Sequence, residues 1–209
     1  MMIVLLIIFA CTLIYFFLSE RVEKHINLLA VQGTLLFIIA FINLIEINVL
    51  GLILILLETL IVKAIIIPRF LNRIRRTNNL NRLVENYIPF FYSVLIITAI
   101  IIASFFTAYS IRNHFVDVKF LAIALSTILG GIYFTIVHKN IFNHIVGIMI
   151  VENGAFLLSL AVGGEFPFLV SMAVLIDILI AVLIIGIFID KIGSAFGNMS
   201  TSSLNKLKD

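Results

Sequence analysis

Long apolar runs alternate with short polar or turn-forming segments along the whole chain. Seven runs have the length of helices, at residues 2–18, 27–44, 48–68, 87–110, 117–137, 141–162 and 167–190. A helix needs about 20 apolar residues to cross a bilayer, and lipid admits only helices or closed barrels as spanning structures. The continuous runs of Ile and Leu lack the alternation of barrel strands. We therefore predict an all-α integral membrane protein with about seven transmembrane helices.

The composition excludes a water-soluble globule. The 209 residues are 63% hydrophobic and 12% charged, whereas soluble domains are about 45–50% apolar and about 25% charged. Seven spans leave room for loops and ends only, so a soluble catalytic domain does not fit. The single cysteine, Cys11, excludes an internal disulfide and a thiolate cage for zinc or iron–sulfur clusters. We expect no catalytic centre, no cofactor and no metal site in this chain.

The basic residues predict the orientation in the membrane. Eleven of the fourteen Lys and Arg residues fall on one side of a seven-span arrangement: in loops 19–26 and 69–86, at Lys139 and in the tail beyond residue 190. Arg112 and Lys119 fall on the opposite side, and Lys63 lies inside a span. Because cytoplasmic loops carry the excess of positive charge, we predict an N-terminus outside and a cytoplasmic C-terminus. The net charge of +3 then needs no nucleic-acid partner.

Four ionisable residues fall near the middle of predicted spans: Glu58, Lys63, Glu152 and Asp177. A charge at the bilayer centre costs about 2.5–3.5 kcal/mol on insertion scales, so such residues usually face protein or water and mark ion pathways. Lys63 is either a relay amine or a counter-ion. Its partner would be Glu152, Asp177 or another subunit, because Glu58 points about 140° away on the same helix. The role of Glu58 stays open between function and structure.

Glu152 and Asp177 form the most informative pair. Each lies about a dozen residues from the turn at 163–166, on opposite sides of it. At 1.5 Å per residue both lie about 18 Å from that turn, and an antiparallel hairpin places them at one depth. Two carboxyl groups in a low dielectric disfavour their ionised forms, so one or both can bind and release a proton. The alternative is a protonated carboxyl hydrogen-bonded to a neighbouring helix.

His144 lies eight residues before Glu152, about 12 Å along the helix axis. Histidine titrates near pH 6.5, so His144 is a candidate point of proton access; the alternative is a solvated interfacial histidine. Gly130 and Gly131 predict close helix packing, and the alternative is a hinge or a local distortion of the helix. Four polar residues either line a hydrated path or bond their own helix and its neighbours: Ser126, Thr127, Tyr133 and Asn153.

Two segments carry a resemblance to a known family. Residues 140–154, which end in Glu152-Asn153-Gly154, and residues 172–184, with Asp177 in their middle, resemble the hydrogenase-4 component E family. Members are membrane subunits of group 4 nickel–iron hydrogenase and formate hydrogenlyase-type complexes. The segment from Lys63 to Pro68 is similar to the third span of that family. Residues 117–190 are also similar to the K subunit of respiratory complex I and the C subunit of Mrp-type antiporters.

The resemblance implies a function. Glu152 corresponds to the glutamate of the second K-subunit helix, and Asp177 takes the place of the glutamate in its third helix. Those acids carry protons through the membrane arm. We expect a non-catalytic subunit of a redox-driven proton or sodium pump in the inner membrane of a prokaryote. The chain would comprise a four-helix extension (1–110), a K-subunit-like unit (111–193) and a polar cytoplasmic tail (194–209).

The same resemblance implies the partners. They would be antiporter-like and complex I H-subunit-like membrane subunits, and a peripheral redox arm that holds Fe–S clusters and Ni–Fe. Two alternatives remain at this point. One is a subunit of an Mrp-like cation/proton antiporter without redox partners, and the other is a structural scaffold whose acids only tie helices together.

Overall fold

The structure is a computed structural model of the chain, and it describes residues 1–19, 21–43, 58–77, 87–111, 116–139 and 141–162. All regular elements in these ranges are helices: α1 (Met2–Leu18), α2 (Val22–Asn43), η1 (Glu58–Ile66), α4 (Ile67–Thr77), α5 (Phe90–Ser110), α6 (Val118–Val137) and α7 (Ile141–Val162). The all-α prediction is confirmed for this part of the chain. The predicted span at 167–190 lies outside the described residues.

Four of the described helices are long and apolar enough to cross a membrane: Val22–Asn43, Phe91–Ser110, Val118–Val137 and Phe142–Val162. The helix α1 is also apolar but shorter, with 17 residues. Several spans of this kind make the chain a multi-pass helical membrane protein.

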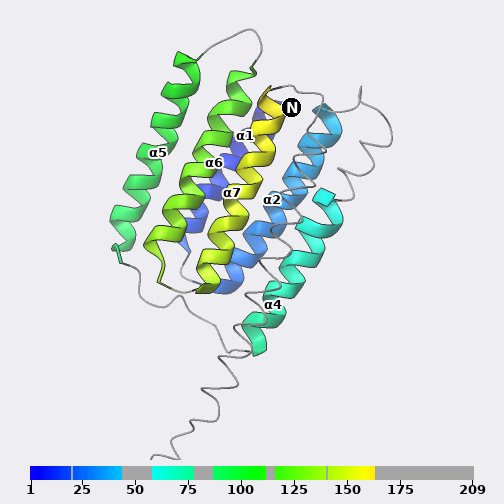
Figure 1. Cartoon of the computed structure of the whole chain (residues 1–209), viewed down its shortest axis with the longest axis vertical. Helices are drawn as coiled ribbons and strands as arrows, with labels where there is room; N and C mark the ends of the chain where they lie inside the picture. The colour runs from blue at the N-terminus through cyan, green and yellow to red at the C-terminus, as the bar shows by residue number, and fades with distance from the viewer. Residues whose placement is uncertain (20, 44–57, 78–86, 112–115, 140, 163–209) are drawn as a thin grey trace, which may run out of the picture.

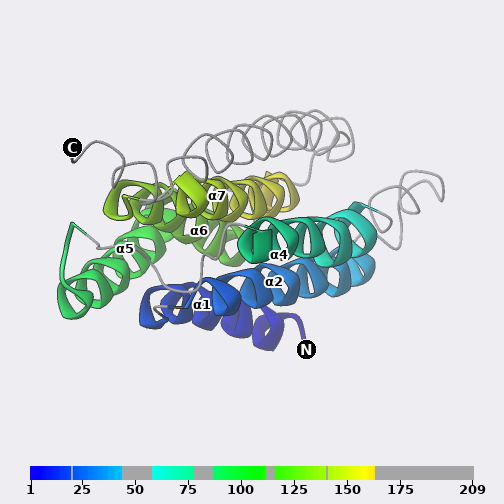
Figure 2. The same cartoon turned by 90° about the horizontal axis from the view of Figure 1, so that it is seen from below.

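The helices form an antiparallel bundle (Figure 1). Helices α6 and α7 pack against each other, and α5 packs against α6. Helix α1 packs against α2, α5 and α6, while η1 and α4 lie along α2, as the view along the bundle shows (Figure 2). The chain reversals at residues 18–22 and 137–141 therefore lie at the same end as the last turn of α4.

Most of the described basic residues, all except Lys63 and Lys119, lie toward this end of the bundle, and we refer to it as the basic end. Arg21, Lys24 and Lys139 lie at its two chain reversals, and α4 adds four arginines. Lys119 lies at the opposite end, in the first turn of α6. The described part thus has the charge asymmetry on which the orientation was predicted.

Two predicted helix boundaries are wrong. Helix α2 begins at Val22, not at residue 27, because Val22, Ile26 and Leu29 are buried on one helical face. Glu23 in its first turn is also favourable at a helix N-terminus.

The predicted loop 69–86 is helical through Thr77, since α4 extends beyond the apolar run. One face of this basic segment packs against α2: Leu71 is fully buried. Arg75 Nη1 binds Glu23 Oε2 at 2.7 Å. The packing of one face stabilises the helix although its other residues are polar. The length of the hydrophobic run alone did not indicate this packed face.

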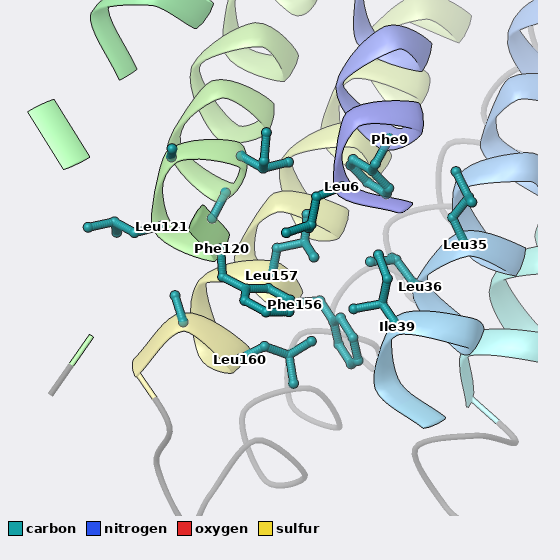
Figure 3. Close-up of a cluster of buried hydrophobic side chains, with 14 of the residues drawn as sticks. Leu6, Phe9, Leu35, Leu36, Ile39, Phe120, Leu121, Phe156, Leu157 and Leu160 are labelled. Atoms are coloured by element: carbon teal, nitrogen blue, oxygen red, sulfur yellow. The ribbon is translucent and has the colours of Figure 1, made fainter. Parts of the chain in front are cut away.

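The buried core consists of two apolar clusters. The first cluster joins α1, α2, α6 and α7 and is drawn in Figure 3, where it includes Leu6, Phe9, Leu35, Leu36, Ile39, Phe120, Phe156, Leu157 and Leu160. The second cluster lies toward the basic end and includes Leu13, Phe16, Phe17, Ile26, Leu29, Phe134, Phe142, Ile145 and Ile150. Between the two clusters, each of these four helices carries buried polar residues near its middle.

Glycines bring α6 and α7 into backbone contact at this level. A Cβ added at Gly131 would lie 2.8 Å from the backbone nitrogen of Val151, and one at Gly154 would lie 2.8 Å from that of Ile128. Distances under 3.0 Å are closer than real Cβ contacts. The predicted close packing at Gly131 is therefore confirmed. It brings the middle of α7 into direct contact with α6.

Candidate functional site

A buried ion pair lies between the two apolar clusters. Lys63 Nζ of η1 is 2.7 Å from Glu152 Oε1 of α7, and both side chains are only 5% exposed. The same Nζ lies 4.8 Å from the ring centre of Phe156, within the range of a cation–π contact. Of the partners that the sequence offered for Lys63, the structure places Glu152 beside it.

The element that presents Lys63 is a π-helix. It ends at Ile66, two residues before Pro68, which has no N–H to donate to the carbonyl of Ala64 four residues earlier. A π-helix shifts its hydrogen bonds to the fifth residue along and is frequent at functional sites. The π-helix and Pro68 thus lie in the same short segment as the buried amine of Lys63.

Gly33 of α2 lets the backbone of η1 approach at this point. A Cβ on Gly33 would lie 2.9 Å from the nitrogen of Ala64 and 3.0 Å from the carbonyl carbon of Lys63. Since these atoms are backbone, they cannot rotate away as a flexible side chain can. The absence of a side chain at Gly33 therefore lets the backbone at Lys63 and Ala64 lie directly against α2.

A chain of hydrogen bonds begins at Asn153, the residue after Glu152, and crosses the bundle. Asn153 Nδ2 donates to Gln32 Oε1 at 2.9 Å, and Gln32 Nε2 donates to Thr12 Oγ1 at 2.8 Å. Thr12 Oγ1 in turn donates to the carbonyl of Phe9 at 2.6 Å. The chain links the middles of α7, α2 and α1. The sequence analysis named Asn153 but missed Gln32 and Thr12, although a glutamine inside an apolar run is a visible signal.

A small cavity adjoins the ion pair. Its volume is about 10 Å³, and the described residues that line it are Leu29, Lys63, Ile67, Met149, Glu152 and Asn153. A buried water needs roughly this much space and two to four polar partners. Three of the lining residues are polar, so the cavity suits about one water molecule between the ion pair and the hydrogen-bond chain.

Three other polar residues named from the sequence form hydrogen bonds within the protein, which is the structural one of their two predicted roles. Ser126 Oγ donates to the carbonyl of Ala122 at 2.7 Å, and Thr127 Oγ1 donates to that of Ile123 at 2.6 Å. Tyr133 donates to Ser93 Oγ at 3.3 Å and so ties α6 to α5. These hydroxyls bond their own helix or a neighbour, as polar residues inside a span often do.

Three histidines of the described part, His25, His138 and His144, lie toward the basic end. His25 is fully buried, and its Nε2 lies 3.0 Å from the carbonyl oxygen of Phe16 and 2.9 Å from that of Ser19, so this nitrogen is the donor. Its ring centre is 6.3 Å from that of His138. His144 is half-buried in the first turns of α7 and acts electrostatically on His138. The role of His144 as a point of proton access stays a prediction.

The two remaining candidates cannot be placed. Glu58 is the first residue of η1, but its side chain is outside the described part. Asp177 lies outside the described residues altogether, so its predicted depth beside Glu152 stays a prediction. Within the described ranges, no group of three or more His, Cys, Asp or Glu side chains is arranged to hold a metal ion.

The polar chain gives a first testable expectation. Gln32→Leu removes the acceptor of Asn153 and the donor to Thr12, and it leaves a buried amide unpaired. We expect the free energy of unfolding to fall by about 1–2 kcal/mol, as for buried polar contacts between membrane helices. Reversible unfolding in mixed micelles measures it. Thr34→Val, at an exposed position of the same helix, should change stability far less. An equal loss in the two variants would mean that the chain of hydrogen bonds does not contribute to stability.

His138 gives a pH-dependent expectation. It caps α6 outside the span, and burial lowers its pKa below the ordinary 6.5, with a further lowering by His144. A folded-state pKa below the unfolded one makes protonation favour unfolding, so stability is complete above about pH 6.5 and falls as the pH decreases. His138→Asn should reduce the fall in the unfolding midpoint between about pH 7.5 and pH 5.5. Lys139→Gln, a change at the exposed neighbouring residue, should preserve the fall in the unfolding midpoint. An unchanged fall in His138→Asn would contradict the assignment of this pH dependence to His138.

The arrangement holds a pair of opposite charges inside the bundle, near the middle of α7. The Nζ–Oε1 distance of 2.7 Å is that of a charge-assisted hydrogen bond, so a proton that reaches the carboxylate competes directly with the ammonium group for it. The adjoining cavity and amide chain supply polar groups for a single water molecule beside the pair.

No family model, no curated protein and no solved structure matches this chain.

Proposed function

We propose that the chain is a non-catalytic membrane subunit of a multisubunit, redox-driven proton or sodium pump, and that Glu152 and Lys63 form part of its ion path. The observation that carries the proposal is the buried ion pair near the middle of α7. Apolar residues of the same volume often stabilise a fold as well as a buried pair does, and intramembrane charges are expensive. A pair kept at this depth is therefore better explained by transport than by scaffolding.

The chemistry of transport follows from the pair. A proton that binds Glu152 neutralises its carboxylate and releases the ammonium group of Lys63. Departure of the proton restores the pair, so each transfer moves a charge between two defined states. In this proposal Asp177 is a second carrier at the same depth, and His144 is the access point from the basic end. A carboxylate also binds Na⁺, so the same residues serve either ion.

The identity of the host complex is supported by the sequence resemblance alone. A group 4 hydrogenase-like or complex I-like assembly would supply the electron chemistry through Fe–S clusters and Ni–Fe in other subunits. The proposal includes seven spans, an N-terminus outside and a cytoplasmic C-terminus in a prokaryotic inner membrane. The gathering of basic residues at one end of the bundle favours this orientation.

The alternative function is that of an Mrp-like antiporter subunit without redox partners, which the resemblance of residues 117–190 also favours. Purification of the native assembly through a tag on this chain, with mass spectrometry and metal analysis, separates the two. Nickel and iron with hydrogenase-like subunits are expected. Antiporter subunits without these metals would favour the alternative, and a lone homo-oligomer would contradict both.

A further inference from the structure

The exposed face of α4 carries three arginines. Arg69, Arg73 and Arg76 are exposed, whereas Leu71 and Arg75 face the bundle. Arg75 is occupied within the protein, since its Nη1 binds Glu23 at 2.7 Å and its Nε donates to Asn72 Oδ1 at 3.0 Å. Arg69, Arg73 and Arg76 share the exposed side of α4 and form what we call the arginine face.

The arginine face borders an open depression. Its volume is about 340 Å³, and the described residues that line it are Arg69, Asn72, Arg73 and Arg76. This volume is within the range of ligand pockets. The planar guanidinium group bonds phosphate oxygens through two parallel N–H donors, so the lining suits a phosphate group or another compact anion.

The position of the arginine face along the helix points to the source of that anion. On η1, directly before α4, Ile61, Ile65 and Ile66 are 40%, 38% and 48% exposed. Within one turn beyond Ile66 the outward side chains change from isoleucine to arginine at Arg69. A change of this kind marks the boundary between hydrocarbon and headgroups. Helix α4, which carries the arginine face, runs to the basic end of the bundle (Figure 1).

We propose that the arginine face binds the phosphate headgroup of an anionic phospholipid, whose acyl chains lie against the exposed isoleucines of η1. Clusters of basic residues at the end of a span attract anionic lipids. A phospholipid matches both chemistries on one continuous face, whereas an acidic protein segment matches only the arginines. This inference does not depend on the proposed ion path.

The test uses the full chain, delipidated in neutral detergent and reconstituted into phosphatidylcholine nanodiscs with added phosphatidylglycerol or cardiolipin. Bound anionic lipid is counted by native mass spectrometry. The variant is Arg69→Gln/Arg73→Gln/Arg76→Gln. The matched control, Arg21→Gln/Lys24→Gln/Lys139→Gln, removes the same charge from the same end. We expect the first to weaken anionic-lipid binding by roughly a hundredfold, at about fivefold per basic residue, and the control to change it much less.

Each other outcome overturns the proposal. Equal losses in the variant and the control would mean that net charge alone attracts the lipid. Inorganic phosphate that displaces the lipid completely at equal concentration would assign the depression to a free anion. A polyglutamate probe bound in preference to lipid would assign it to an acidic protein. Should the triple variant fail to fold, Arg73→Gln and Arg76→Gln are each expected to weaken binding about fivefold, and unchanged binding in both would overturn the proposal.

Discussion

Removing one member of the Lys63–Glu152 pair is expected to lower the free energy of unfolding by about 3–5 kcal/mol, because a buried charge then loses its ion-pair partner. Glu152→Gln removes the carboxylate that Lys63 binds, and Lys63→Met removes the ammonium group that Glu152 binds. Both side chains are 5% exposed, so solvent screens neither charge. The measurement is reversible unfolding of each variant in mixed micelles.

The double variant Lys63→Met/Glu152→Gln should be more stable than either single variant, because neither charge is left alone. The pair between Arg75 and Glu23 provides a control in the same protein. Glu23 is 60% exposed, and exposed pairs contribute only about 0–1 kcal/mol, so Glu23→Gln should have a small effect. Additive losses at Lys63 and Glu152 would mean that the two side chains are not paired in the membrane.

Gly33→Val is expected to displace η1 and to lower stability by about 1–3 kcal/mol, as overpacking does in close-packed cores. The first added carbon would lie 2.9 Å from the nitrogen of Ala64, which belongs to the backbone. Because Lys63 is the neighbouring residue, the displacement should also loosen its contact with Glu152. Gly33→Val should therefore reduce ion transport as well as stability.

The control for Gly33 is the adjacent residue on the same helix. Thr34 is exposed, so Thr34→Val adds a branched apolar side chain without meeting η1. It should leave both stability and transport close to those of the unchanged protein. Equal effects of the two substitutions, or normal transport in a stable Gly33→Val protein, would show that the helix contact does not position Lys63.

The apolar runs were sufficient to predict most of the bundle. The predicted spans at 2–18 and 141–162 coincide with α1 and α7, and 117–137 differs from α6 by one residue. The errors at the start of α2 and at the end of α4 have one cause. Helices continue into polar sequence when one face still packs, as Leu71 does, and a count of consecutive apolar residues does not detect a single buried face.

The candidate site was predicted only in part. Lys63 and Glu152 were identified because a charged residue inside an apolar run is costly in lipid. Their contact with each other could be found only from the structure, because η1 and α7 are far apart in sequence. Gln32 and Thr12 were missed because uncharged polar residues are common in spans and usually bond their own helix. Gly33 gave no signal in the sequence, since its role depends on which backbone lies opposite.

The measurement that tests the central claim most directly is ion translocation by native membrane vesicles that carry Glu152→Gln. The host assembly should still form and catalyse its electron transfer or ion exchange, but coupled translocation should fall to the background of vesicles without the assembly. Glu23→Gln, the same change at an exposed site, should translocate normally. Full coupled translocation with a correctly assembled Glu152→Gln protein would contradict the account, because the carboxyl group of Glu152 would then carry no ion.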